Sequence, residues 1–107
     1  MTNAREAVET IAKEQELFRV DTLCEIIDSS PRTLQRLFAD HIGVTPKWVI
    51  NRYRMLDLLE TLNTGEPVDL AELALDFGFT DQSHFSTQFK TITGQSPAAY
   101  LKRQAKT

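Results

Sequence analysis

Two arginines and a glutamine lie close together in the chain and carry the hydrogen-bonding groups that can read DNA bases. With one threonine they form a short polar set: Arg32, Thr33, Gln35 and Arg36. In a helix that begins at Pro31, these side chains lie opposite Leu34 or flank that opposite side. Arginine can donate two hydrogen bonds to guanine and glutamine can pair with adenine, each worth about 1–3 kcal/mol of discrimination. The set therefore predicts a surface that reads bases in the major groove, with an ordinary solvent-exposed face as the alternative.

A second polar set follows later in the chain. It consists of Gln82, Ser83, Ser86, Thr87 and Lys90. On a helix that buries Phe85, three of them (Ser83, Thr87 and Lys90) lie outward and the other two lie beside them. Hydroxyl groups and a single cation suit phosphate contacts and weaker base reading better than strong guanine recognition. For this set, a solvent-exposed face without a ligand is an equal alternative.

Helices must position both sets, because apolar residues recur at helical spacing and no stretch alternates apolar and polar residues as a strand would. Spacing, caps and stop residues predict seven helices: residues 3–17, residues 20–27, a third from Pro31 to just before Gly43, residues 46–62, residues 70–77, a sixth between Asp81 and Gly94, and a seventh from Pro97 through Leu101. The expected fold class is therefore all-α.

Several residues are expected to face the interior or its edge. The long helix is expected to turn inward Val49, Tyr53, Leu56, Leu59 and Leu62. His41 is expected to pack its ring against the edge of the core, whereas His84 lies off the core and either touches DNA or is exposed without a role. Cys24 is interpreted as a small buried residue rather than a reactive thiol.

The chain contains an internal repeat. Leu34, Phe38, Gly43, Thr45 and Pro46 recur as Phe85, Phe89, Gly94, Ser96 and Pro97, and upstream Val20, Leu23, Cys24 and Ile27 correspond to Leu70, Leu73, Ala74 and Phe77. The shared Gly-x-[Ser/Thr]-Pro element is not periodic, so it is harder to obtain by chance than matching apolar stripes. Small residues at Cys24 and Ala74 suit the close approach of two steeply crossed helices. The repeat predicts a duplicated helix-turn-helix unit.

Charge is distributed unevenly over the 107 residues. Taken alone, the net charge of −3 and the pI near 5.3 argue against a nucleic-acid partner. Residues 31–54, however, carry five cations against one acid, namely Arg32, Arg36, Lys47, Arg52 and Arg54 against Asp40. Residues 82–107 carry four cations and no acid, while residues 1–28 and 57–81 each carry seven acids. The basic stretches therefore coincide with the second helix of each repeat and the helix after it.

Composition and motifs exclude several other classes of protein. One cysteine excludes an internal disulfide and a multi-cysteine metal site, and we expect no cofactor. We expect no transmembrane helix and no signal peptide, hence no membrane partner and a cytoplasmic location. Ser83 and His84 come nearest to a catalytic triad with Asp81, but neighbouring residues on a helix point to different sides. We expect no enzymatic activity.

The motifs resemble those of the AraC/XylS family of bacterial transcription regulators. The second copy carries Leu70-x2-Leu73-Ala74-x2-Phe77-Gly78-Phe79, Phe85-x3-Phe89-Lys90 and Gly94-x-Ser96-Pro97-x2-Tyr100, and the first carries Ser30-Pro31-x2-Leu34-x-Arg36-x-Phe38-x4-Gly43-x-Thr45-Pro46. The resemblance covers roughly residues 4–103. It implies one DNA-binding domain over residues 1–107, with a first subdomain at about 4–45, a linker helix at about 46–63 and a second subdomain at about 66–104.

The resemblance also implies which residues touch DNA. It assigns base or backbone contacts to Arg32, Gln35 and Arg36, to Gln82, Ser83, Ser86 and Thr87, and a backbone contact to Lys90. Two departures matter: Thr87 stands where the family often has arginine, and Ser29 stands where an apolar residue is commoner in the first turn. We therefore expect the first motif to dominate affinity, with weaker readout from the second and a first turn that packs less tightly.

The expected partner is double-stranded DNA, at an operator on the order of 20 bp that is read as two unlike half-sites. A linker helix of about 25 Å, together with its flanking units, can place the two reading helices about one DNA turn apart. The family implies that the acidic surfaces face RNA polymerase or a partner domain. Family members often carry an effector-binding or dimerisation domain ahead of these motifs, so the chain is either a stand-alone regulator or part of a longer one. The alternative function is a helical protein-interaction module that has lost DNA binding.

Overall fold

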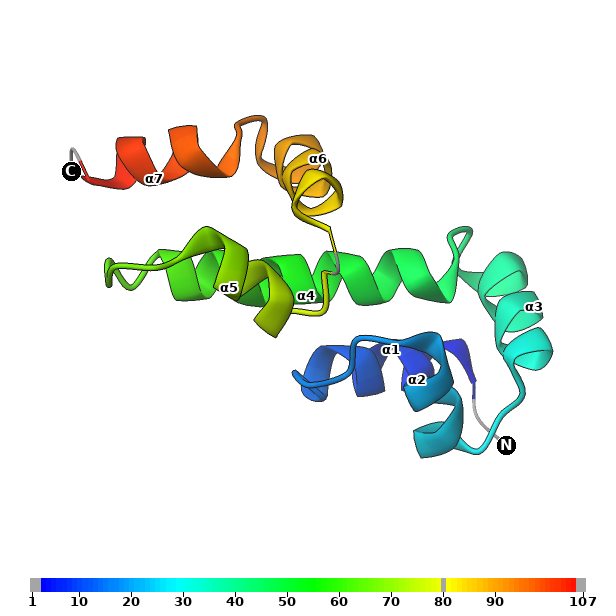
Figure 1. The fold of residues 1–107 in the computed structure, drawn as a ribbon. Helices are drawn as coiled ribbons and strands as arrows, with labels where there is room; N and C mark the ends of the chain where they lie inside the picture. Colours follow the sequence, from blue (N-terminus) through cyan, green and yellow to red (C-terminus); the bar gives the residue numbers. More distant parts are fainter. Residues whose placement is uncertain (1–2, 80, 106–107) are drawn as a thin grey trace. The chain divides into compact units, whose positions relative to one another are not determined.

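The computed structural model describes residues 3–79 and 81–105, and this part of the chain contains seven α-helices and no strand (Figure 1). The helices are α1 (Ala4–Lys13), α2 (Val20–Ile27), α3 (Pro31–His41), α4 (Pro46–Leu62), α5 (Leu70–Asp76), α6 (Gln82–Thr93) and α7 (Pro97–Ala105). The predicted all-α fold is therefore confirmed. In the described ranges, no helix is both long and apolar enough to cross a membrane.

Short polar side chains begin α1, α3, α5 and α6. The capping residues are Asn3, Ser30, Asp69 and Asp81, and each accepts a hydrogen bond from a main-chain N–H in the first turn of its helix. Such caps satisfy donors that the start of a helix otherwise leaves unpaired. The caps predicted at Asn3, Ser30 and Asp81 are confirmed, and Asp69 adds one that the sequence analysis did not include.

The first helix is shorter than predicted. α1 ends at Lys13 rather than near residue 17, and Glu14 leaves the helical conformation with φ −91° and ψ 88°. The Leu17 N–H then donates to the Glu14 carbonyl at 3.0 Å, and Leu17 is buried. Helical spacing in the sequence does not predict this turn, because the turn depends on a tertiary contact, the burial of Leu17 in the core.

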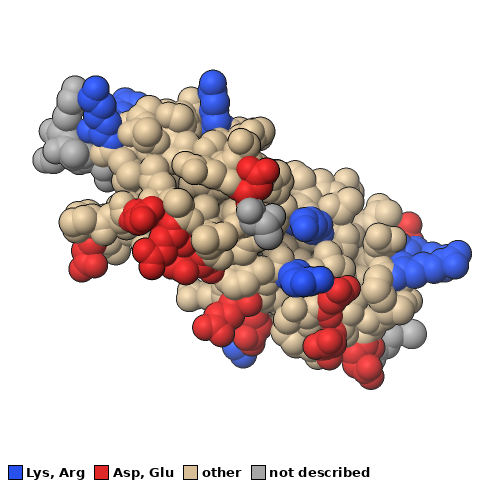
Figure 2. Space-filling view, viewed as in Figure 1, with Lys and Arg blue, Asp and Glu red and all other residues tan. Residues whose placement is uncertain are grey.

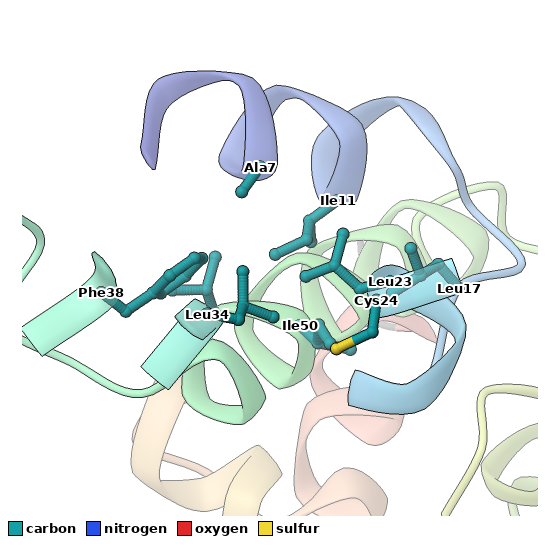
Figure 3. Close-up of a cluster of buried hydrophobic side chains, with 9 residues drawn as sticks. Ala7, Ile11, Leu17, Leu23, Cys24, Leu34, Phe38 and Ile50 are labelled. Atoms are coloured by element: carbon teal, nitrogen blue, oxygen red, sulfur yellow. The ribbon is translucent and has the colours of Figure 1, made fainter. Parts of the chain in front are cut away.

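The chain divides into two compact units, residues 1–54 and residues 55–107, and α4 contributes to both. In the first unit, α1, α2, α3 and the first half of α4 supply one apolar core. Figure 3 shows side chains from these helices, among them Ile11, Leu34 and Ile50, directed into the same space. This core determines which sides of α2 and α3 are turned away from it.

The core of the second unit is built around aromatic rings. Phe79, Phe85, Phe89 and Tyr100 form a chain of edge-to-face contacts with centroids 5.3–5.8 Å apart. This is the geometry that the ring quadrupole favours. The Tyr100 hydroxyl also donates a hydrogen bond to Asn63 Oδ1 at 2.8 Å, which ties α7 to the end of α4. The rings hold α6 firmly by its apolar side.

The long helix α4 buries different residues from those predicted. Leu56 is 45% exposed, while Ile50, Met55 and Leu58 are buried. The other predicted residues pack as expected: Val49 and Tyr53 in the first core, Leu59 and Leu62 in the second. The prediction assumed that one continuous apolar stripe along α4 is buried. It is wrong because the first half of α4 packs in one core and the second half in the other, so the buried side changes along the helix.

Candidate nucleic-acid interface

The first helix-turn-helix consists of α2 and α3. α2 ends at Ile27 and is followed by Asp28, whose φ of 53° is left-handed, and the Ser29 N–H donates to the Cys24 carbonyl at 3.0 Å. This geometry stops the helix and reverses the chain. Ser30 then caps α3, and Pro31 occupies its first position.

The buried side of α3 leaves the first polar set exposed. Leu34 and Phe38 are fully buried. The exposed residues are Arg32, Thr33, Gln35 and Arg36. The Thr33 hydroxyl accepts a hydrogen bond from the Ser30 hydroxyl at 2.8 Å, so part of its capacity is used within the cap. The structure thus brings the four residues onto one accessible helix, although Thr33 is partly committed.

The arginines of this set keep their charge available. Arg5 forms an ion pair with Glu9, and Arg19 forms one with Asp21, whereas within residues 3–79 and 81–105 neither Arg32 nor Arg36 pairs with a carboxylate. Figure 2 shows basic side chains projecting from the region of α3. Unpaired guanidinium groups on an exposed helix are suited to bidentate contacts with guanine or phosphate.

The second helix-turn-helix, α5 and α6, reverses the chain in the same way. The Phe79 N–H donates to the Ala74 carbonyl at 2.9 Å, matching the bond between Ser29 and Cys24, and Gly78 has a φ of +84°. Cys24 and Ala74, the small residues predicted at the helix crossings, are both buried. The sequence repeat therefore corresponds to a repeated hydrogen-bonded turn.

The second polar set is less uniformly exposed. Phe85 and Phe89 anchor α6 in the core. The exposed members of the set are Gln82, Ser83, Thr87 and Lys90, whereas Ser86 is half-buried. Asp81 Oδ1 accepts the Ser83 N–H at 2.7 Å, which fixes the first turn and places a carboxylate beside the set. In the second unit, Figure 2 shows acidic side chains over α5 and basic ones over α7.

Both histidines are exposed, although the sequence predicts His41 to pack against the core edge. His84 is exposed, as its position off the core predicts, and its ring lies against Phe79 with centroids 5.8 Å apart. His41 is also exposed, so the prediction that it packs against the core edge is wrong. Ile42, the residue after the helix end, is partly buried against the core instead. Burying the apolar side chain of Ile42 is more favourable than burying the polar imidazole of His41.

One cation of the basic stretch is unavailable to any ligand. Arg54 is 2% exposed, and its guanidinium donates to the main-chain carbonyls of Ile11 at 2.6 Å, of Leu17 at 3.0 Å and of Glu14. By its place in the sequence, Arg54 counts among the cations that favour nucleic acid. That reading is wrong, because this guanidinium satisfies the carbonyl groups at the end of α1 and in the turn after it.

Sequence reasoning also missed an exposed aromatic residue near the start of α4. Trp48 is 52% exposed, and the Arg52 guanidinium lies 5.9 Å from the centroid of its ring. The Thr45 hydroxyl accepts the Trp48 N–H at 3.1 Å and so caps this helix. Tryptophan and arginine one helical turn apart are a recognisable cation–π spacing in sequence. Lys47, beside this pair in the first turn of α4, is exposed as well.

Cys24 is buried, as predicted. Burial raises the pKa of its thiol above the ordinary value, and the carboxylate of Asp21 raises it further. A neutral buried thiol is a poor nucleophile and a poor metal ligand. Among the residues that the structure describes, no group of His, Cys, Asp and Glu is arranged to hold a metal ion.

Comparison with known proteins agrees with this architecture. Residues 23–103 match the helix-turn-helix domain family. The chain is 38% identical over 74 residues to the HTH-type transcriptional activator RhaS of Pectobacterium carotovorum, covering 69% of this chain and 26% of that protein. It is 38% identical over 84 residues to the transcriptional regulatory protein HptR of Staphylococcus aureus, covering 78% of this chain and 32% of that protein. The chain thus spans between a quarter and a third of these regulators.

Solved structures show the same fold. The C-terminal domain of AraT, a response regulator from Geobacillus stearothermophilus, aligns with a TM-score of 0.73 at 27% identity, covering 92% of this chain and 83% of that one. A probable AraC family transcriptional regulator from Rhodopseudomonas palustris aligns with a TM-score of 0.81 at 24% identity, covering 94% of each chain. The named relatives are transcription regulators rather than enzymes. The chain belongs to the helix-turn-helix family of AraC/XylS-type DNA-binding domains.

Proposed function

We propose that this chain binds double-stranded DNA in a sequence-specific way and thereby regulates bacterial transcription. The observation that carries the proposal is the exposed side of α3, where Arg32 and Arg36 lie unpaired around Gln35 while Leu34 and Phe38 hold the helix from behind. A helix presented in this way fits the major groove, whose base edges pair with arginine and glutamine. The alternative, an interaction module without DNA binding, draws no support from the named relatives.

The two helix-turn-helix motifs then read two unlike half-sites of an operator on the order of 20 bp. The first subdomain reads with Arg32, Thr33, Gln35 and Arg36, and the second with Gln82, Ser83, Ser86, Thr87 and Lys90. Base contacts by arginine discriminate more strongly than contacts by hydroxyl groups. The first motif therefore supplies most of the sequence preference, and the second supplies phosphate contacts and weaker readout.

The partners other than DNA follow from the same proposal. The acidic residues of α5 repel phosphate, so the outer surface of this helix suits a protein partner, either RNA polymerase or another domain of the same regulator. The relatives named above are three to four times longer than the matched region. In a longer regulator, an effector-binding or dimerisation domain would supply what this domain lacks in non-specific affinity.

Selection of bound sequences from a random DNA pool, followed by mobility shifts at fixed salt, tests the proposal. Arg32→Ala and Arg36→Ala should each weaken binding to the selected operator by about tenfold or more, as expected for the loss of a bidentate base contact. The matched control is Arg5→Ala, which removes the same charge from an exposed position on α1. Failure to select any sequence would contradict the proposal, and so would equal effects of the three substitutions.

Salt dependence supplies an independent measurement. If phosphate contacts contribute, the logarithm of the binding constant should fall linearly with the logarithm of the salt concentration. Lys90→Ala should reduce that slope by about one while weakening binding to all sequences alike. A slope that is unchanged in this variant would remove Lys90 from the interface.

A further inference from the structure

A hollow of about 240 Å³ opens beside α3, within the first unit. It is lined by Gln35 and Ala39 of α3, by Gly43, Val44 and Thr45 of the following turn, and by Pro46 at the start of α4. Gln35 and Ala39 are one helical turn apart and therefore lie on the same side of α3. The hollow thus continues the surface that carries the proposed base-reading residues.

The lining of this hollow suits an apolar group and not a phosphate. No charged side chain lines it, and its wall includes the methyl group of Ala39 and the apolar side chains of Val44 and Pro46. The hydroxyl of Thr45 already accepts the Trp48 N–H at 3.1 Å. The side-chain amide of Gln35 is the other polar group among the lining side chains. A phosphate would find no cation among the lining residues.

The space at the turn is open as well. Gly43 has a φ of +89°, and a Cβ atom built on it would meet no atom within 4 Å. The hollow is therefore not filled from the Gly43 side of the turn. A group that approaches α3 from the DNA can enter beside Ala39 without displacing the protein.

The apolar group that the major groove offers is the 5-methyl group of thymine, and alanine is one of the residues that contact it. Glutamine pairs with adenine, so an A·T pair presents both ligands on the same groove edge. We propose that the hollow beside Gln35 and Ala39 receives the methyl group of a thymine in the half-site read by the first motif. This inference rests on the proposed function, and it makes Ala39 a specificity-determining residue.

Deoxyuridine substitution tests the inference, because it removes the methyl group and keeps every hydrogen bond of the base. Each thymine of the selected operator is replaced in turn, and binding of the whole chain is measured by mobility shift at fixed salt. One thymine should be sensitive, with binding weakened about threefold to tenfold, the range expected for one buried methyl group. Other replacements should change binding less than twofold.

Two variants locate the sensitive methyl group. Ala39→Ser places a hydroxyl at the wall of the hollow, and the difference between thymine and uracil should then shrink below twofold. Ala98→Ser, at an exposed position on α7, is the matched control and should retain the full difference. A circular dichroism spectrum of each variant verifies that the helices are intact.

The outcomes separate this inference from the proposal on which it rests. If the operator is bound but no single thymine is sensitive, the hollow does not receive a methyl group and DNA binding stands. The inference is equally overturned if Ala39→Ser leaves the thymine preference unchanged. If no DNA sequence is selected at all, both proposals fail together.

Discussion

Arg54 Nη2 donates a hydrogen bond to the main-chain oxygen of Ile11 at 2.6 Å, which joins α4 to the last turn of α1 through a buried guanidinium. The same side chain reaches the carbonyls of Glu14 and Leu17. The last carbonyls of an α-helix have no partner inside the helix. Arg54 therefore completes the end of α1 and secures the turn that follows it.

Replacing this arginine should destabilise the first unit. In Arg54→Met, the three carbonyls lose their hydrogen bonds from the guanidinium while the apolar stem is kept, and we expect the free energy of unfolding to fall by roughly 2–4 kcal/mol. Urea unfolding followed by the fluorescence of Trp48, the single tryptophan of the chain, measures this loss in the first unit.

Arg36→Met is the matched control, because it makes the same change at an exposed position of the same unit. It should alter stability by less than about 0.5 kcal/mol. A similar small loss in both variants would show that the carbonyls find other partners and that Arg54 is dispensable.

Two of the leucines of α4, Leu56 and Leu58, should lose very different amounts of stability on truncation. Leu58 is fully buried, so Leu58→Ala should cost about 2–5 kcal/mol through lost burial and the cavity left behind. Leu56→Ala removes the same atoms from a position that is 45% exposed and should cost less than about 1 kcal/mol. Thermal unfolding followed by circular dichroism compares them, and equal losses would contradict the assignment of the buried side of α4.

The cap of α6 should matter through its hydrogen bond rather than its charge. Asp81 Oδ1 accepts the Ser83 N–H at 2.7 Å, and Asp81→Ala should cost about 1 kcal/mol. Asp81→Asn keeps an acceptor and should cost only a few tenths of a kcal/mol, which urea unfolding can resolve. If Asn were as harmful as Ala, interaction of the carboxylate with the helix dipole would be the main contribution.

Cys24 should react slowly and should make stability depend on alkaline pH. Because burial raises the pKa of the thiol, the unfolded chain loses this proton at a lower pH than the folded chain. Its contribution to stability is therefore fully present below the unfolded pKa and is lost as the pH rises through the folded one. At about pH 8.5, near the ordinary pKa of a thiol, alkylation should be much slower in the native protein than in urea.

Cys24→Ala isolates this thiol from the lysines and tyrosines that titrate in the same range. The stability difference between the wild type and this variant should shrink as the pH is raised above about 8.5. A difference that does not change with pH, or a thiol that reacts as fast in the native protein as in urea, would contradict the raised pKa.

Much of the local structure could be predicted because its causes are local. Ser30 and Pro31 mark the start of α3 by their own chemistry, and Leu34 and Phe38 mark its buried side by their spacing. The outward position of Arg32 and Arg36 then follows from helix geometry alone. The exposure of this polar set is a consequence of those few residues.

The misassigned residues are those whose environment depends on distant parts of the chain. Arg54 looked like another surface cation, but carbonyl groups about forty residues earlier in the sequence hold it inside. Leu56 matched an apolar stripe, but the change of core along α4 leaves it exposed. His41 is exposed at the end of α3, and Ile42 packs against the core where His41 was predicted to pack.

The seven helices, the duplicated helix-turn-helix and the two polar sets follow from the amino-acid sequence alone, because caps, stop residues and apolar spacing act over one or two helical turns. Tertiary packing sets which cations are exposed, which side of α4 is buried, and where a hollow opens beside Gln35. These features depend on groups that are distant in the chain and adjacent in space. A pattern of neighbouring residues cannot encode them, because the partner that buries or frees each side chain lies outside the pattern.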